Sequence, residues 1–242
     1  MDRGFHASIR AQRMLIWLAL ILGAIFMIAY VGLMQFFPPP PANLPADQVA
    51  ELYRAHNIRF RIGVILGLVS GGFLMPFSVV ISVQMARLEK GVPIWALMQA
   101  LAGTLGTFFI WMPVLIWGTA AFSAERAPEL TLLLHELGWL CFITPLALFP
   151  LELLCVIVVC FSKEEDDRYS AFPRWIGYLT AWNAVQSFGG PLAILFKTGI
   201  FSWAGLLPFW LPFFLFFVWA IAISYTMLRA LAHQERLAVS AA

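Results

Sequence analysis

A single carboxylate, Glu152, interrupts the apolar run ALFPLELLCVIVVCF at residues 147 to 161. It lies about nine residues before the end of the run, or roughly 14 Å, which is near the midplane of a hydrocarbon core about 30 Å thick. A charged side chain there costs about 2.5–3.5 kcal/mol, so the acid should face a bundle interior and find a partner or stay protonated. Such an acid indicates either a site for a proton or a solute, or a neutral hydrogen-bonded group that fixes helix register.

Polar residues in neighbouring apolar runs lie at a similar depth to Glu152. Asn183 and Gln186 do so in the next run, and Thr104 in the preceding one, with Gln99 somewhat below it. A stripe of polar and small residues at helical spacing accompanies the two amides: Thr180, Asn183, Ser187 and Gly190. We expect the acid, the two amides and Thr104 to converge as a candidate polar binding cluster. Hydrogen bonds between membrane helices average about 0.6 kcal/mol, so the cluster would contribute little to stability.

Helix breaks occur in the second and fifth apolar runs. They are Gly71 and Gly72 in the second run, and Gly189, Gly190 and Pro191 in the fifth. Backbone groups freed at membrane depth must be satisfied by protein or by a water-filled cavity, and paired breaks in two halves of a chain are typical of transporter sites. Because the breaks lie at different offsets within their runs, ordinary kinks are the favoured interpretation.

A second set of candidate residues lies toward the opposite membrane face. His135 and Glu136 are adjacent, but Trp139 occupies the position of the second histidine of a zinc-binding H-E-x-x-H helix. His56 could approach them to give a site of two histidines and one carboxylate, although packing at the membrane interface is the favoured interpretation. Lys197 is expected to extend to the outer surface, or alternatively to attract an anionic ligand. We assign no catalytic residue, metal or cofactor.

The elements that position these residues are long apolar segments. The chain has 242 residues, of which 62% are hydrophobic and 12% charged, whereas soluble domains have about 25% charged residues. The net charge of +2 is too small to indicate a nucleic-acid partner. We therefore predict an all-α polytopic membrane protein, a six-transmembrane-helix bundle that forms a single membrane domain over 1–242. The predicted spans are about 14–36, 62–85, 93–118, 138–161, 174–196 and 206–229.

The longest predicted connection, the outer segment 38–61, lies between the first two spans. It begins with a run of prolines, Pro38 to Pro41, that predicts a stiff extended strut. From Ala46 the pattern indicates a short extracytoplasmic amphipathic helix, which either packs on the bundle or acts as a lid. Lys and Arg are more frequent in the connections on the N-terminal side, which predicts that both termini are cytoplasmic.

Several stretches resemble a group of uncharacterised bacterial six-span integral membrane proteins. They are FPRWIGYLTAW at 172–182, GGPLAILFKTGIFSWAGLLPFWLP at 189–212, ISVQMARLEKG at 81–91 and the pentapeptide HELGW. The resemblance extends over most of the chain. It implies a six-span fold in the bacterial inner membrane, and it carries over no functional residue.

Three classes of function follow from these features. The leading hypothesis is small-solute, proton-linked or lipid-handling transport, which draws on Glu152 and the helix breaks. The second is an accessory or scaffold subunit, because Gly63, Gly67 and Gly71 form a close-packing helix face. The third is an intramembrane metal-dependent enzyme. The expected partners are the lipid bilayer, a small-molecule or proton substrate, and a second copy of the chain or another membrane subunit.

Overall fold

The computed structural model describes residues 2–123, 125–162 and 169–240, and every regular element in these ranges is a helix. The α-helices are α1 (Asp2–Met27), α2 (Ala46–Arg54), α3 (Asn57–Ser70), α4 (Leu74–Ala86), α5 (Ile94–Phe122), α6 (Pro128–Ile143), α7 (Phe149–Phe161), α8 (Arg174–Ser187) and α9 (Leu211–Ser240). Shorter π or 3₁₀ turns join or extend them: η1 (Ile28–Leu33), η2 (Gly71–Phe73), η3 (Thr144–Leu148), η4 (Gly190–Ile194), η5 (Gly199–Phe201) and η6 (Leu206–Trp210).

Five helical segments among the described residues are long and apolar enough to cross a membrane. They are Ser8–Leu33, Asn57–Ala86, Ile94–Phe122, Pro128–Phe161 and Gly199–Ser240. They overlap the predicted spans 14–36, 62–85, 93–118, 138–161 and 206–229. The prediction of an all-α membrane protein is confirmed to this extent, because five of the six predicted spans fall on helical segments of spanning length.

The predicted bundle of six spans is not confirmed, because 174–196 does not form one long helix. The helix α8 ends at Ser187, and at about 1.5 Å per residue its 14 residues measure roughly 21 Å, short of a hydrocarbon core of about 30 Å. The chain then passes into the 3₁₀ turn η4, which contains Pro191. A Cβ at Gly190 would lie 2.4 Å from the carbonyl oxygen of Ile143, so this backbone packs directly on the end of α6.

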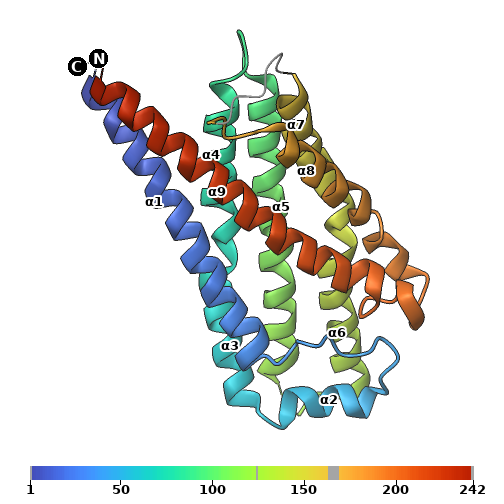
Figure 1. Cartoon of the computed structure of the whole chain (residues 1–242). Helices are drawn as coiled ribbons and strands as arrows, with labels where there is room; N and C mark the ends of the chain where they lie inside the picture. The colour runs from blue at the N-terminus through green and yellow to red at the C-terminus, as the bar shows by residue number, and fades with distance from the viewer. Residues whose placement is uncertain (1, 124, 163–168, 241–242) are drawn as a thin grey trace.

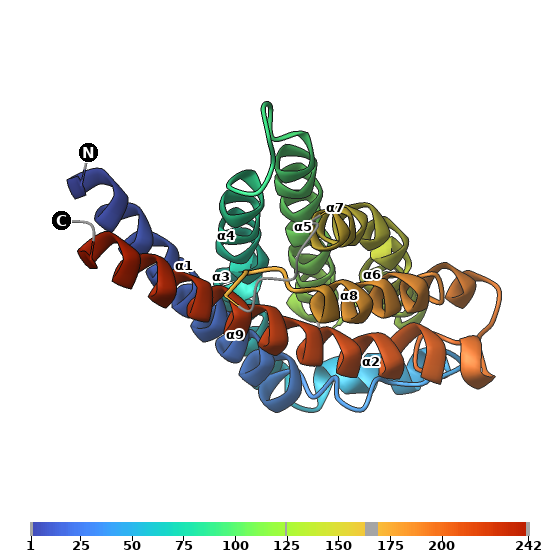
Figure 2. The ribbon, with the colours of Figure 1, turned by 45° about the horizontal axis from the view of Figure 1, so that its top comes forward.

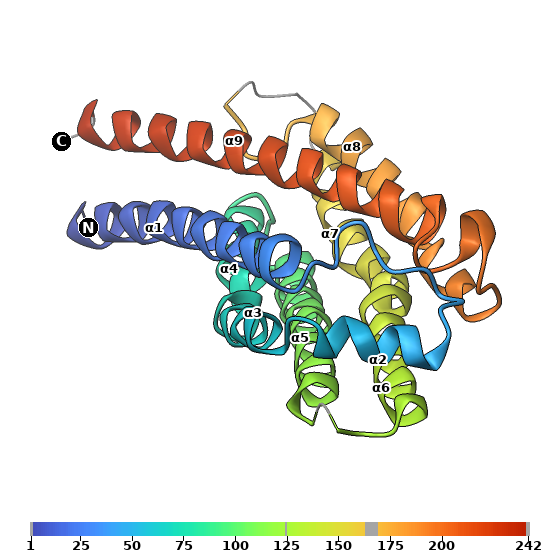
Figure 3. The ribbon, with the colours of Figure 1, turned by 90° about the horizontal axis from the view of Figure 1, so that it is seen from below.

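The first and last helices lie side by side on one flank of the molecule, and both chain ends are at the same end of this pair (Figures 1 and 3). Arg13 of α1 and Glu235 of α9 form an ion pair of 2.8 Å there. A chain of glutamine amides also links the pair to α4, with Gln84 Nε2 donating to Gln12 at 2.6 Å and Gln234 Nε2 donating to Gln84 at 3.1 Å. Away from these contacts the two helices diverge (Figure 1).

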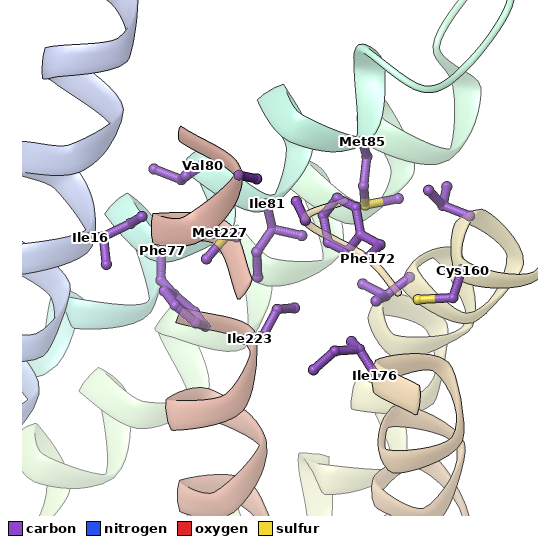
Figure 4. Packing of buried hydrophobic residues seen from close by; sticks show 14 of the residues in the cluster. Ile16, Phe77, Val80, Ile81, Met85, Cys160, Phe172, Ile176, Ile223 and Met227 are labelled. Atoms are coloured by element: carbon purple, nitrogen blue, oxygen red, sulfur yellow. The ribbon is translucent and has the colours of Figure 1, made fainter. Parts of the chain in front are cut away.

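The interior beneath α1 and α9 is a continuous apolar core. Figure 4 shows Ile81 of α4 close to Ile223 of α9, with Ile16 of α1 on one side of them, beyond Phe77, and Ile176 of α8 on the other. The helix α8 lies between α7 and α9 (Figure 2), so Cys160 of α7 joins the same core. This core fixes the relative positions of the helices that carry the polar residues described below.

The predicted short helix of the outer segment is present as α2. It buries Val49, Ala50 and Tyr53, whereas Leu52 is exposed. The Tyr53 hydroxyl shares a hydrogen bond of 2.8 Å with His135 Nδ1 of α6, and burial raises the pKa of this phenol well above its ordinary value. The neutral hydroxyl therefore anchors α2 on α6, which agrees with packing on the bundle rather than with a free lid.

Candidate functional site

Glu152 lies in the first turn of α7 and faces the helices α4 and α5. Its side chain is buried, and its Oε1 accepts a hydrogen bond of 3.0 Å from Gln99 Nε2 of α5. The same Gln99 amide nitrogen donates to Ser78 Oγ at 3.1 Å, and Gln99 Oε1 accepts a hydrogen bond from Ser82 Oγ. Gln99 is completely buried and uses both ends of its amide. It therefore holds Glu152 in one position relative to α4 and α5.

A glycine on α5 makes room for this network. A Cβ at Gly103 would lie 2.2 Å from Ser78 Oγ and 2.8 Å from Glu152 Oε1, which is too close for any side chain. Gly103 comes one helical turn after Gln99, so the glycine and the amide share the same face of α5. The close approach of α4, α5 and α7 therefore depends on a residue without a side chain at this position.

Glu152 also lines a cavity of about 120 Å³ that opens in part to the surroundings, and we refer to it as the Glu152 cavity. Helix breaks surround it: Phe73 comes from η2, Leu146 from η3 and Phe209 from η6. Irregular backbone at membrane depth is tolerated where it is buried in protein or lines a cavity. The remaining walls are formed largely by phenylalanine side chains: Phe77, Phe109, Phe142, Phe149, Phe213, Phe216 and Phe217, together with Trp219.

Three side chains give the cavity a polar region. The hydrogen bond that Glu152 makes among the described residues is at Oε1, from Gln99, and Oε2 has no partner there. Gln186 Nε2 donates to Asn183 Oδ1 at 2.8 Å, and Gln186 Oε1 is buried without a partner in the described part of the chain. The polar region thus contains two acceptors without a partner among the described residues, Glu152 Oε2 and the buried Gln186 Oε1.

The structure brings part of the predicted polar cluster together. Glu152, Asn183 and Gln186 do line one cavity, although the two amides bond to each other rather than to the acid. The expected position of Thr104 is wrong, since this side chain is exposed and its hydroxyl donates to the carbonyl of Ala100 in its own helix. The position of Thr104 along its helix is close to that of Glu152, as its adjacent residue Gly103 shows. Because adjacent helical residues point about 100° apart, Gly103 faces the acid and Thr104 does not.

The sequence-based cluster missed the residues that bind the acid. Gln99 was expected below the cluster, but its long side chain reaches Glu152, and Ser78 and Ser82 of α4 complete its hydrogen bonds. The glycine at position 103 was the available signal, because a small residue marks the helix face that a neighbour approaches.

The two predicted helix breaks have different surroundings. Gly71 and Gly72 form η2, where a Cβ at Gly72 would meet nothing within 4 Å and one at Gly71 would make ordinary contacts. Gly189 and Gly190 lie against backbone, since their Cβ atoms would approach Leu207 O at 2.9 Å and Ile143 O at 2.4 Å. The second break, which continues through Pro191, is therefore a tightly packed turn and not an ordinary kink.

The outer-side candidates do not assemble into a metal site. His135 is bonded to Tyr53, and Glu136 forms an ion pair of 2.7 Å with Lys197, whose side chain is 70% exposed. His56 is exposed and lines a separate hollow beside α2. The described residues contain no group of three or more His, Cys, Asp or Glu that could hold a metal ion. The structure thus gives no support to the metal-dependent enzyme.

His135 belongs to an aromatic cluster under α2. Phe36 lies at its centre, with ring centroids 4.8 Å from Trp117, 5.3 Å from Trp139 and 6.0 Å from His135. Trp203 stacks on Trp139 at 6.2 Å and donates a hydrogen bond of 2.8 Å to the carbonyl of Pro40. The proline strut is thereby fixed to the bundle, and this end of the molecule is filled by packed rings.

Comparison with protein-family models, with curated proteins and with solved structures finds no match to this chain. The arguments about function therefore rest on the Glu152 cavity itself.

Proposed function

We propose that this protein is a transport protein of the bacterial inner membrane that moves a hydrophobic solute through the Glu152 cavity in exchange for protons. The observation that carries the proposal is a carboxylate oxygen that has no hydrogen-bond partner among the described residues and belongs to a side chain lining an otherwise largely apolar cavity. Ligand sites typically combine apolar walls with a few placed polar groups. An ionisable group at membrane depth is by default a functional-site hypothesis.

The hydrogen bonds of Glu152 support a proton-exchange role. Gln99 anchors Oε1, so the side chain keeps its position when a proton or a solute occupies Oε2. Gln99 donates to Glu152 and also to Ser78, and neither of these two residues titrates at physiological pH. The titratable side chain that interacts with Glu152 is the Cys155 thiol, three residues further along α7. A proton and a solute that both require Oε2 would exclude each other, and this competition is the basis of exchange.

The helix breaks around the cavity support the transport interpretation. The turns η2, η3 and η6 contribute residues to its wall, and η4 packs against Leu146 of η3. Breaks of this kind are typical of transporter sites at the midplane, where they let parts of a helix move separately. The six-span topology with both termini in the cytoplasm belongs to this proposal, with η4 extending the short crossing that begins with α8.

Proton flux in liposomes tests the proposal. Purified protein is reconstituted with a trapped pH-sensitive dye, a pH gradient is imposed, and hydrophobic solutes of different charge are added. Wild type should dissipate the gradient with at least one solute, and Glu152→Gln should not. Glu129→Gln, which makes the same change at an exposed position on α6, should behave as wild type. Equal flux in all three proteins would refute proton exchange at Glu152, and no flux in any of them would favour the accessory-subunit hypothesis.

A further inference from the structure

The charge balance of the Glu152 cavity indicates what it binds. Among the residues that line it, Glu152 is the only one with an ionisable acid or base, and no Lys, Arg or His is present. The ion pairs found in the described part of the chain are Arg13 with Glu235 and Lys197 with Glu136, so Glu152 has no cationic partner there. A buried charge without a partner is strongly unfavourable, and a bound cation would supply the missing charge.

The walls of the cavity favour the same kind of ligand. Aromatic rings line it on several sides, for example Phe77 from α4, Phe149 from α7, and Phe213 and Trp219 from α9. The face of an aromatic ring attracts a cation, by about 0.5–1 kcal/mol at exposed sites and about 2 kcal/mol or more where water is excluded. The rings and the carboxylate together therefore discriminate by charge as well as by hydrophobicity.

A second cavity of about 210 Å³ shares a wall with the first. It lies between α1 and α9, where the two helices diverge, and its lining is apolar throughout, with Ala24 on one side and Ala220 on the other. Phe73, Phe77 and Phe216 border both cavities. A ligand that arrives between α1 and α9 would meet apolar side chains in the second cavity and would then pass these shared phenylalanines to reach Glu152. Such a ligand must itself be lipophilic.

We propose that the ligand of the Glu152 cavity is a lipophilic organic cation, held by the Glu152 carboxylate and by the surrounding ring faces, which reaches the site between α1 and α9. This inference rests on the proposed function, because it names the class of solute that would exchange with the proton. An amine or a quaternary cation that carries aromatic or aliphatic groups has the required chemistry.

Two probes of the same shape and opposite charge test the inference. Tetraphenylphosphonium and tetraphenylborate each carry four phenyl groups around one central atom, so a difference in binding reports charge. Equilibrium binding to purified protein in detergent should show the cation bound by wild type and Glu129→Gln, and the anion bound by neither. Glu152→Gln should weaken the cation about 30-fold or more, the size expected when one partner of a buried charge pair is lost.

Substitution of two adjacent phenylalanines tests the contribution of the aromatic walls to binding. Phe213 lines the cavity, whereas Phe214 is 56% exposed on the outside of α9. Phe213→Leu should weaken the cation about 2- to 30-fold, the range of a cation–π contact, and Phe214→Leu should leave it unchanged. Thermal unfolding of each variant establishes that it is folded, and Glu152→Asp, which keeps the charge, should retain the preference for the cation.

The outcomes separate this inference from the proposed function. Equal binding of both probes, weakened by Phe213→Leu but not by Glu152→Gln, would overturn the cation inference and leave a solute cavity. Binding of neither probe would also overturn it, and proton flux driven by neutral solutes would then decide the transport proposal alone. Selective cation binding without any solute-driven proton flux would uphold the inference and refute transport.

Discussion

Replacement of Gly103 by alanine tests whether the Glu152 network depends on close helix approach. The new Cβ would lie 2.2 Å from Ser78 Oγ, 2.8 Å from Ser78 Cβ and 2.8 Å from Glu152 Oε1. At least one of these groups must move, and overpacking of this kind costs about 1–3 kcal/mol. Alanine recovers about 1 kcal/mol through its better helix propensity. We therefore expect a net loss of up to about 2 kcal/mol in the free energy of unfolding.

Gly72→Ala is the matched control for this substitution. Its Cβ would meet no atom within 4 Å, and its backbone does not require a glycine. It should leave the free energy of unfolding unchanged or raise it by about 0.5–1 kcal/mol, because alanine restricts the unfolded chain. The difference between Gly103→Ala and Gly72→Ala is then the contribution of crowding at the network.

The assay is thermal or denaturant unfolding of both variants in the same detergent, with Ser78→Ala added as a second change. Ser78→Ala removes the oxygen that lies closest to the new Cβ, so it should rescue part of the loss in Gly103→Ala, and coupling between contacting residues is about 0.5–3 kcal/mol. If Gly103→Ala were as stable as Gly72→Ala, α4, α5 and α7 would not pack as described, and the account of Glu152 as a clamped side chain would be refuted.

Three further predictions concern stability, and unfolding in detergent measures each of them. Glu152→Gln should be at least as stable as wild type, because it keeps an acceptor for Gln99 and removes an ionisable group, and a loss above about 1 kcal/mol would contradict this. Tyr53→Phe should lose about 1–3 kcal/mol, since it leaves buried His135 Nδ1 without its partner, and an unchanged transition would show that α2 is held by packing alone. Lys197→Ala should change stability by no more than about 1 kcal/mol, because its ion pair is exposed, and a larger loss would indicate a structural role for the turn before α9.

Most of the fold could be predicted from the sequence because a hydrophobic run long enough to cross a membrane is expected to fold as a helix. Backbone groups in hydrocarbon must be satisfied internally, and a helix does this within a single segment. The segment 174–196 departs from that rule for a reason that is only partly local. Gly189 and Pro191 mark a break, but the course of the chain after it depends on contacts of Gly190 with Ile143, which no local pattern encodes.

The sequence predicted how deep each site residue lies along its helix, but not the direction in which each side chain points. The spacing of residues along each run places Glu152 and Asn183 at one depth, and both do line the cavity. The direction in which a side chain points around its helix depends on which neighbour the helix packs against, and this decided between Thr104 and Gln99. The polar network is therefore a tertiary property, whereas the acid that it surrounds is visible in the sequence.

The hydrogen bonds of Gln99 determine which oxygen of Glu152 can carry a proton. Ser82 donates to Gln99 Oε1, so the amide presents only its nitrogen to Glu152, and that nitrogen can only donate. A proton on Glu152 Oε1 would compete with the N–H of Gln99 that donates to the same oxygen. Removing this conflict would require the Gln99 amide to flip by about 180°, which would break its hydrogen bond from Ser82. The proton is thus directed to Oε2. When Glu152 is protonated, the carboxyl group therefore donates from Oε2 alone, in a fixed orientation.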